Sequence, residues 1–214
     1  NIRSFICSEP LAPWGNLSYS QLEEALTSQE GLPDYVFDFY NKHSSHEERI
    51  RHFSQLFASF FEEAISQTTG FLRDYFIFER EWRLIMMGFR AKKLNRDLVA
   101  ELQYEDPEDL TVAHLLAQKD ARSYEPPHGY EDLKEVFHTY TNNPMKLYKH
   151  MCNYRFYKIE ECERGELFSL DVLLSYIARL MIVEKWIELE LREDEIELDS
   201  LMKGYNKKQL EVSA

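Results

Sequence analysis

The side chains with the clearest potential for chemistry are histidines at helical spacing. His43 and His46 stand three residues apart, with His52 nearby, and pairs of histidines on one helix face are common metal ligands. No suitably placed third ligand accompanies them, and Ser44 and Ser45 indicate the start of a helix here. We therefore expect surface or capping histidines rather than a metal site.

A second metal pattern is the Glu-x-x-His spacing of Glu135 and His138. Helical di-iron proteins use this spacing, but they need two copies of it and two further inward-facing glutamates. The sequence contains no second Glu-x-x-His. We therefore expect no metal ion here and no bound cofactor.

Nucleophilic and nucleotide-binding motifs are missing as well. The sequence has no Gly-x-Ser-x-Gly, no Gly-x-x-x-x-Gly-Lys and no Gly-x-Gly-x-x-Gly. Cys7, Cys152 and Cys162 are widely spaced, without a Cys-x-x-Cys pair or an activating context. This odd number of cysteines favours a reducing compartment over a disulfide framework. The sequence therefore predicts a non-catalytic protein.

One carboxylate stands out. Glu184 follows Ile177 by seven residues and precedes Ile187 by three, which places it on the apolar stripe of the last helix. A buried, unpaired carboxylate is unfavourable. We expect Glu184 to form a buried ion pair with an arginine such as Arg83 or Arg90, or else to lie at an interface.

The strongest periodicity belongs to a helix expected from residue 71 to about residue 102. Its apolar side chains recur every three or four residues, and they are Phe71, Tyr75, Phe78, Trp82, Ile85 and Phe89. We expect this stripe to be core. On the opposite arc stand Arg73, Arg80, Arg83 and Arg90, either as a solvated face or as a docking strip for an acidic partner. Gly88 predicts a kink or a close helix crossing.

Composition points to an all-α fold. Glycine and proline number only seven each in 214 residues, and no strand pattern is present. Further helices are expected at 18–30, 34–40, 45–69, 107–119, 130–139 and 145–162, and from 169 onward. We predict an elongated bundle of long antiparallel helices in two stacked lobes. Residues 1–122 form an N-terminal lobe with an irregular arm, 123–129 a linker, and 130–214 a C-terminal lobe with an acidic tail.

Charge limits the partners. The formal net charge is −13, which disfavours nucleic acid and anionic membranes and favours a basic protein surface. No run approaches the roughly 20 apolar residues of a membrane span, and residues 1–10 lack a signal pattern. We expect a cytoplasmic protein with protein partners and no small-molecule substrate.

Two segments resemble a known family. Residues 71–85 and 90–94 (FLRDYFIFEREWRLI and RAKKL) resemble a helix of the C subunit of V/A-type ATPases, whose eukaryotic counterpart is the d subunit. Residues 168–180, followed by Glu184-Lys185-Trp186, are similar to that family's Phe-Ser-x-x-x-x-x-x-Tyr helix. The pattern is most similar to a divergent bacterial group found with V-type ATPase components in chlamydiae and Bacteroidetes. The chain is shorter than the family, with room for about two of its three helical units.

The resemblance implies a role and partners. The family forms a helical socket on the cytoplasmic face of the membrane rotor ring, where it receives the foot of the central axle and passes torque during ion-coupled rotation. Such a protein is peripheral to the inner membrane and contacts other V-type ATPase subunits, with no catalytic residue, cofactor or metal. The alternative is a free-standing acidic helical adaptor, chaperone or scaffold.

The docking-strip interpretation generates a prediction. Simultaneous charge reversal of Arg73, Arg80 and Arg83 is expected to weaken partner binding and to leave helicity intact, because solvated arginines do not hold the fold together. Circular dichroism and a binding assay on the triple variant check the two parts, and unchanged binding would remove the docking strip.

Overall fold

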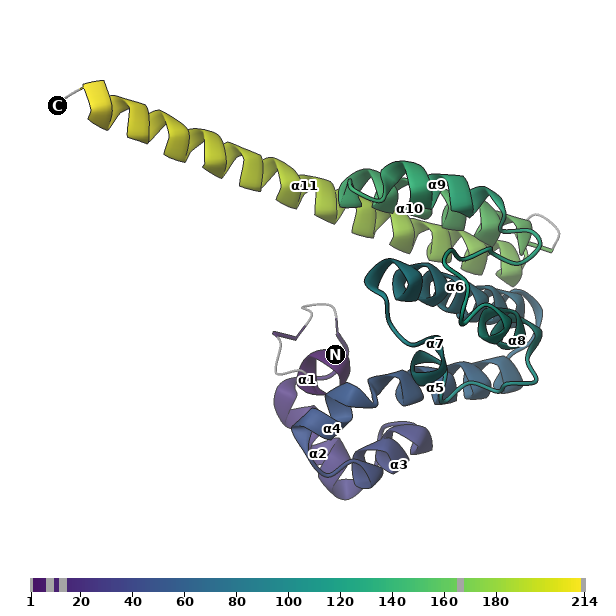
Figure 1. Ribbon diagram of the computed structural model, residues 1–214. Coiled ribbons are helices and arrows are strands. Elements are labelled where there is room, and N and C mark those ends of the chain that lie inside the picture. Colours follow the sequence, from purple (N-terminus) through teal and green to yellow (C-terminus); the bar gives the residue numbers. More distant parts are fainter. Residues whose placement is uncertain (1, 7–9, 12–14, 165–167, 213–214) are drawn as a thin grey trace. The chain divides into compact units, whose positions relative to one another are not determined.

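The chain is described by a computed structural model (Figure 1). It covers residues 2–6, 10–11, 15–164 and 168–212, with the side chains of all of these except Arg3 and residues 192–212. Within these ranges every regular element is a helix. The prediction of an all-α fold is therefore confirmed.

The helices follow one another in this order. They are α1 (Ile2–Ile6), α2 (Tyr19–Ser28), α3 (Asp34–Lys42), α4 (His46–Arg51), α5 (Phe53–Gln67), α6 (Gly70–Leu94), α7 (Leu98–Glu101), α8 (Leu110–Ala117), α9 (Asp132–Tyr140), α10 (Pro144–Glu161) and α11 (Leu170–Val212). The chain divides into two compact units. Unit 1 comprises residues 1–68 and 79–127, and unit 2 comprises residues 69–78 and 128–214. Helix α6 contributes its first nine residues to unit 2 and the remainder to unit 1.

Helix ends follow local capping chemistry. Several helices therefore begin or end at other residues than the sequence predicted. Helix α2 is capped by Ser18, because the Ser18 and Gln21 side chains form a reciprocal capping box. The prediction of a single helix over 45–69 is wrong, because the helix is interrupted at His52 and forms α4 and α5. A second capping box, between Ser45 and Glu48, starts α4.

The helix expected to reach residue 102 ends earlier, at Leu94. Asn95 adopts a left-handed conformation with φ 53°, and the Arg96 amide donates to the Ala91 carbonyl at 2.8 Å, a common way to end a helix. Helix α8 likewise begins at Leu110 and not near Pro107. Its cap is Asp109, whose carboxylate accepts from the amides of Thr111 and Val112.

Helix α6 lies at the centre of the buried side chains of unit 1. Leu84 and Ile85 are fully buried, as are Val112 and Leu115 of α8. A Cβ atom at Gly88 would lie only 2.6 Å from Leu115 Cδ2 and 2.8 Å from the Tyr124 ring. The glycine therefore permits a close approach of α8 and the following segment to α6, as the sequence predicted.

The aromatic stripe of α6 is core. Trp82 is 8% exposed, and Phe71, Phe78 and Phe89 are also buried. A separate apolar cluster in unit 1 joins α1, α3 and α5, and its buried members are Ile6, Val36, Phe39 and Leu56. Phe71 and Phe78 belong to unit 2. Trp82 and Phe89 on α6, together with the cluster around α3, supply apolar contacts inside unit 1.

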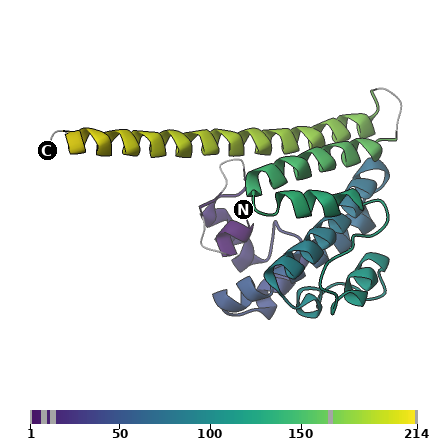
Figure 2. The ribbon, with the colours of Figure 1, turned by 45° about the horizontal axis from the view of Figure 1, so that its top comes forward.

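In unit 2, α10 lies beside the first half of α11, and α9 packs against α10 (Figures 1 and 2). Cys152 and Ile159 of α10 are buried, together with Ala178 and Ile182 of α11. The Tyr154 hydroxyl donates to the Gly129 carbonyl at 2.8 Å and so fixes α10 to the segment that precedes α9. These contacts orient α11 about its own axis, which determines the face it leaves outside.

Burial of Trp82 sets a stability prediction. Trp82→Ala is expected to lower the free energy of unfolding by about 3–5 kcal/mol, because it removes a large core side chain and leaves a cavity. Urea denaturation followed by far-ultraviolet circular dichroism measures the change. Leu110→Ala, at a side chain that is 88% exposed, is the matched control and should shift the value by less than about 0.5 kcal/mol. Equal effects of the two substitutions would place Trp82 outside the core.

Candidate functional site

The two central arginines of the predicted docking strip are bound inside unit 1. Arg80 Nη1 donates to Asp109 Oδ2 at 2.8 Å, and its Nη2 donates to Glu105 Oε2 at 3.1 Å. Arg83 donates to the other oxygen of the same Glu105 carboxylate. The Glu105 side chain is only 4% exposed, so one buried carboxylate bridges two guanidinium groups.

Three parts of unit 1 place the members of this network. The arginines follow one turn apart on α6, Asp109 is the N-cap of α8, and Glu105 lies in the turn between α7 and α8. The Arg83 guanidinium also lies 5.8 Å from the ring centroids of Phe57 and Phe61 on α5. The network therefore joins α5, α6 and the α7–α8 turn.

The electrostatics of the network agree with its geometry. Burial lowers the pKa of Arg83, and the neighbouring Glu105 offsets this only in part. Burial alone would also lower the pKa of Arg80, but its contacts with Asp109 and Glu105 outweigh burial and raise it. Asp109 is the reverse case: burial would raise its pKa, yet Arg80 and two backbone amides lower it. The contacts of this network thus favour the charged forms of Arg80 and Asp109.

The docking-strip prediction is consequently wrong for Arg80 and Arg83, since their guanidinium groups already bind carboxylates of the same unit. The triple charge reversal that includes them would place carboxylates beside Glu105 and destabilise unit 1. Arg73 and Arg90 are exposed, and in the part of the chain that the structure describes neither has an ion pair. For these two residues the docking role stays a prediction.

Helix α11 presents a long apolar face to the outside. Side chains that would be core in an ordinary amphipathic helix are here between 44% and 68% exposed. They are Leu170, Leu173, Tyr176, Ile177, Leu180, Met181, Ile187 and Leu191. Contiguous apolar surface of more than a few hundred Å² is uncommon on monomers and marks interaction sites. This apolar face is the candidate functional site of the chain.

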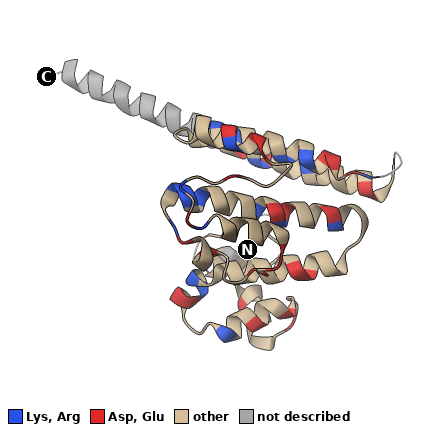
Figure 3. Ribbon diagram, turned by 45° about the vertical axis from the view of Figure 1, so that its right-hand side comes forward, with Lys and Arg blue, Asp and Glu red and all other residues tan. Residues whose placement is uncertain are grey.

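The opposite face of α11 binds α10. Ser175, Ala178 and Ile182 are buried there, and small side chains let two helices approach closely. Arg179 donates to Glu160 at 2.8 Å and to Glu163 at 3.4 Å. Charged residues of both signs are distributed over α10 and the first part of α11 (Figure 3). Packing and ion pairs therefore use one side of α11 and leave the apolar face uncovered.

The burial predicted for Glu184 is wrong. Glu184 is exposed, because the stripe that carries it points away from α10. Of the two arginines suggested as its partner, Arg83 is bound to Glu105, and Arg90 is exposed. Among the described residues, no hydrogen bond or ion pair reaches the Glu184 carboxylate. Its other predicted setting, an interface, remains open.

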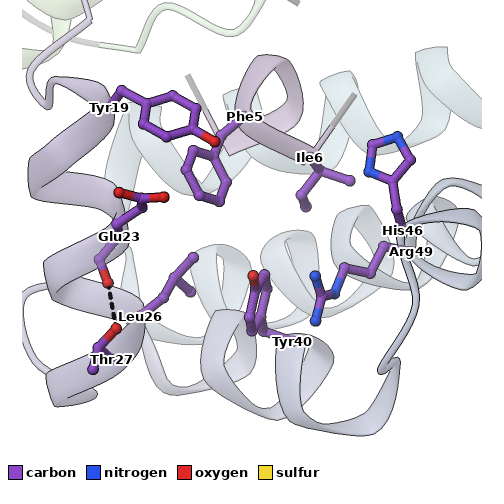
Figure 4. Close-up of a pocket in the computed structure, with 9 residues that line it drawn as sticks. All are labelled: Phe5, Ile6, Tyr19, Glu23, Leu26, Thr27, Tyr40, His46 and Arg49. Carbon is purple, nitrogen blue, oxygen red and sulfur yellow. Dashed lines mark hydrogen bonds between the residues drawn. The ribbon is translucent and has the colours of Figure 1, made fainter. Parts of the chain in front are cut away.

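Unit 1 contains a pocket of about 460 Å³ beside α1 (Figure 4). Its lining includes Glu23, His46 and Arg49 together with aromatic rings. Arg49 is already engaged, because its guanidinium lies 3.5 Å from the Tyr40 ring centroid and its Nε donates to the His43 carbonyl at 2.8 Å. Arg49 is thus held by contacts within unit 1, while Glu23 and His46 also line the pocket.

The histidines take structural positions. Of the two expected settings, surface or cap, His43 takes the second: it is buried and is the C-cap residue of α3. Its ring stacks on that of His52 with centroids 4.6 Å apart, and its Nε2 lies 3.1 Å from Gln55 Oε1. His52 in turn hydrogen-bonds the Tyr104 hydroxyl through Nδ1. This chain of contacts holds the α4–α5 break in place.

Metal ligation finds no support in the side chains that the structure describes. Glu135 and His138 are both located on α9 and belong to no cluster of ligands. Nowhere among the described residues do three His, Cys, Asp or Glu side chains gather as a metal ion would require. In the same residues, none of the helices is sufficiently long and apolar to cross a bilayer. Cys7 lies outside the described residues.

Comparison with known proteins identifies the family to which the chain belongs. The family model described as "Protein of unknown function (DUF2764)" matches residues 1–204. The chain belongs to the DUF2764 family. Three chlamydial proteins, each described as an uncharacterized protein, are similar to this DUF2764 chain. The Chlamydia muridarum protein is 35% identical over 149 residues, which are 70% of this chain and 56% of that protein.

The other two relatives match over more of their length. The Chlamydia trachomatis protein is 30% identical over 86% of this DUF2764 chain and 72% of its own length. The Chlamydia pneumoniae protein is 33% identical over 85% of this chain and 70% of its own. The chain thus spans little more than half of the first relative and about 70% of the others. No solved structure matches it.

The buried network generates a mutational prediction. Glu105→Gln is expected to lower the free energy of unfolding by about 3–5 kcal/mol, because it leaves two buried guanidinium groups without their shared counter-charge. The exposed Glu108→Gln is the matched control and should change it by less than about 0.5 kcal/mol. Urea denaturation of both variants measures the change. A small change in the free energy of unfolding for Glu105→Gln would mean that water solvates these arginines.

Asp109 generates a prediction about pH. Its folded-state pKa is lowered from 3.8, so the unfolded chain binds this proton more readily than the folded chain does. The stabilisation is therefore present above about pH 4 and is lost as the pH falls through the folded pKa. Asp109→Asn keeps a good N-cap residue and removes the titration. Between about pH 5 and pH 3 the variant should lose less stability than the unaltered chain, as measured by thermal melts.

Proposed function

We propose that this chain is a non-catalytic part of a V-type ATPase, acting as the central-stalk socket that links the membrane rotor ring to the central axle. The observation that carries the proposal is the apolar face of α11, which overlaps the segment that resembles the C subunit of these ATPases. A member of an assembly has a partner to cover such a face, whereas a free monomer keeps it in water at a cost in solubility.

Other features support the same role. A torque-transmitting socket needs rigid helices and contact surface, and it needs no active site. The crossing at Gly88 and the network around Glu105 stiffen unit 1 without supplying catalytic groups. The proposal includes two stacked helical lobes, a cytoplasmic position peripheral to the inner membrane, and contacts with the rotor ring and axle. The protein itself would not be an enzyme.

A free-standing acidic helical adaptor is the second candidate. Its supporting observation is the net charge of −13, which suits a protein that binds basic surfaces outside any fixed assembly. The two candidates differ in their partners. A socket binds axle and ring subunits in fixed ratio, whereas an adaptor or chaperone exchanges among partners.

Affinity purification from native membranes tests the proposal. The tagged full chain should recover V-type ATPase axle, catalytic-head and rotor-ring subunits in fixed ratio under mild detergent, as measured by mass spectrometry. A second preparation carrying Arg73→Glu and Arg90→Glu tests whether the two exposed arginines contribute, with lower recovery expected if they do. Recovery of none of these subunits, while the ATPase is intact in the same membranes, would leave the adaptor.

A further inference from the structure

The exposed apolar face of α11 has the spacing of a coiled-coil seam. Residues at positions 170, 173, 177, 180, 184, 187 and 191 alternate in steps of three and four, which places them at the a and d positions of three heptads. The stretch spans about 32 Å of helix at roughly 1.5 Å per residue. Every one of these positions is apolar except 184, an a position occupied by glutamate.

The acidic flanks of the seam are already neutralised inside unit 2. Glu188 accepts from Lys185 at 2.8 Å, and Glu190 pairs with Lys149 of α10. Of the side chains described between Leu170 and Leu191, Glu184 is the charged group on this face that no partner engages. A helix that covers the seam must therefore satisfy this carboxylate.

A second copy of the chain does not satisfy it along this stretch. In a parallel pair, a positions face each other and Glu184 would meet Glu184 of the other copy. In an antiparallel pair within residues 170–191, it would face an apolar d residue and stay unpaired, which is costly. Two chains that each carry a charge of −13 also repel. An anionic membrane surface is disfavoured by the same charge.

We propose that α11 docks one amphipathic helix of a different protein through residues 170–191, and that this helix carries a lysine or arginine opposite Glu184. Apolar side chains supply the contact area, and the single charge at the seam fixes the register and selects the partner. This inference rests on the proposal that the chain works within an assembly, and it does not depend on which assembly that is.

Site-specific photocross-linking in the full chain tests the docking. Leu180→p-benzoylphenylalanine places the probe on the seam, and the same probe at Lys185, which is exposed on another side of α11, is the matched control. The Leu180 probe should join to one segment of another protein, and the Lys185 probe should not. Peptide mapping must then show an apolar heptad pattern with a lysine or arginine in register with Glu184.

Charge exchange tests the recognition. Glu184→Lys should weaken binding to the mapped partner roughly thirtyfold or more, as expected when a buried charge pair is broken, while Glu184→Gln weakens it less. When the partner's basic residue is replaced by glutamate, the altered partner should again bind the chain that carries Glu184→Lys. Binding is measured by titration calorimetry with the purified full chain.

Other outcomes overturn the inference. These are cross-links from Leu180 to a second copy, to another part of the same chain or to lipid, an absence of cross-links, or binding unaffected by Glu184→Lys. Failure here is separable from failure of the ATPase role. Co-purification with the ATPase without a seam cross-link would refute only the docking, and a basic helix from an unrelated protein would refute only the ATPase assignment.

Discussion

Helix α11 has two usable faces, and its own chain covers one of them. Ser175, Ala178 and Ile182 pack against α10, and Arg179 ties the same side to Glu160 and Glu163. A helix cannot rotate to bury a second stripe on its opposite side without breaking these contacts. The apolar face and Glu184 are therefore left outside together, and the interpretation of the chain as a part of something larger depends on this constraint.

The arginines of α6 show the opposite outcome: a pattern that suggests an exposed face is in part bound inside the unit. Four arginines on one arc of α6 suggest a surface strip, yet Arg80 and Arg83 are bound within unit 1. A carboxylate with a 4% exposed side chain requires compensation, and two guanidinium groups one helical turn apart provide it. The charge of these arginines serves the fold, and only Arg73 and Arg90 of the four remain for a partner.

The buried contacts of unit 1 and the apolar face of α11 differ in character. Several polar side chains inside unit 1 contact one another, as from His43 through His52 to Tyr104, whereas the buried Tyr124 hydroxyl has no hydrogen-bond partner among the described residues. The apolar face of α11 is elongated, which suits a helix better than a small substrate. Membership in the DUF2764 family is consistent with either proposed role, and the partner must be found by experiment.

Local structure could be predicted from the residues alone, because it depends on neighbours in the chain. Scarce glycine and proline with three-and-four spacing predicted the helices, and the stripe from Phe71 to Phe89 predicted core. Gly88 predicted a kink or a close crossing, and the structure has Leu115 and Tyr124 close against it. Capping decided the helix ends, and the start predicted at residue 107 failed because the Asp109 carboxylate caps α8 at Leu110. The tertiary structure decided which stripe of α11 is buried and which carboxylates meet Arg80 and Arg83. Periodicity shows that a face is apolar, but only the packing of other elements shows whether the same chain covers it.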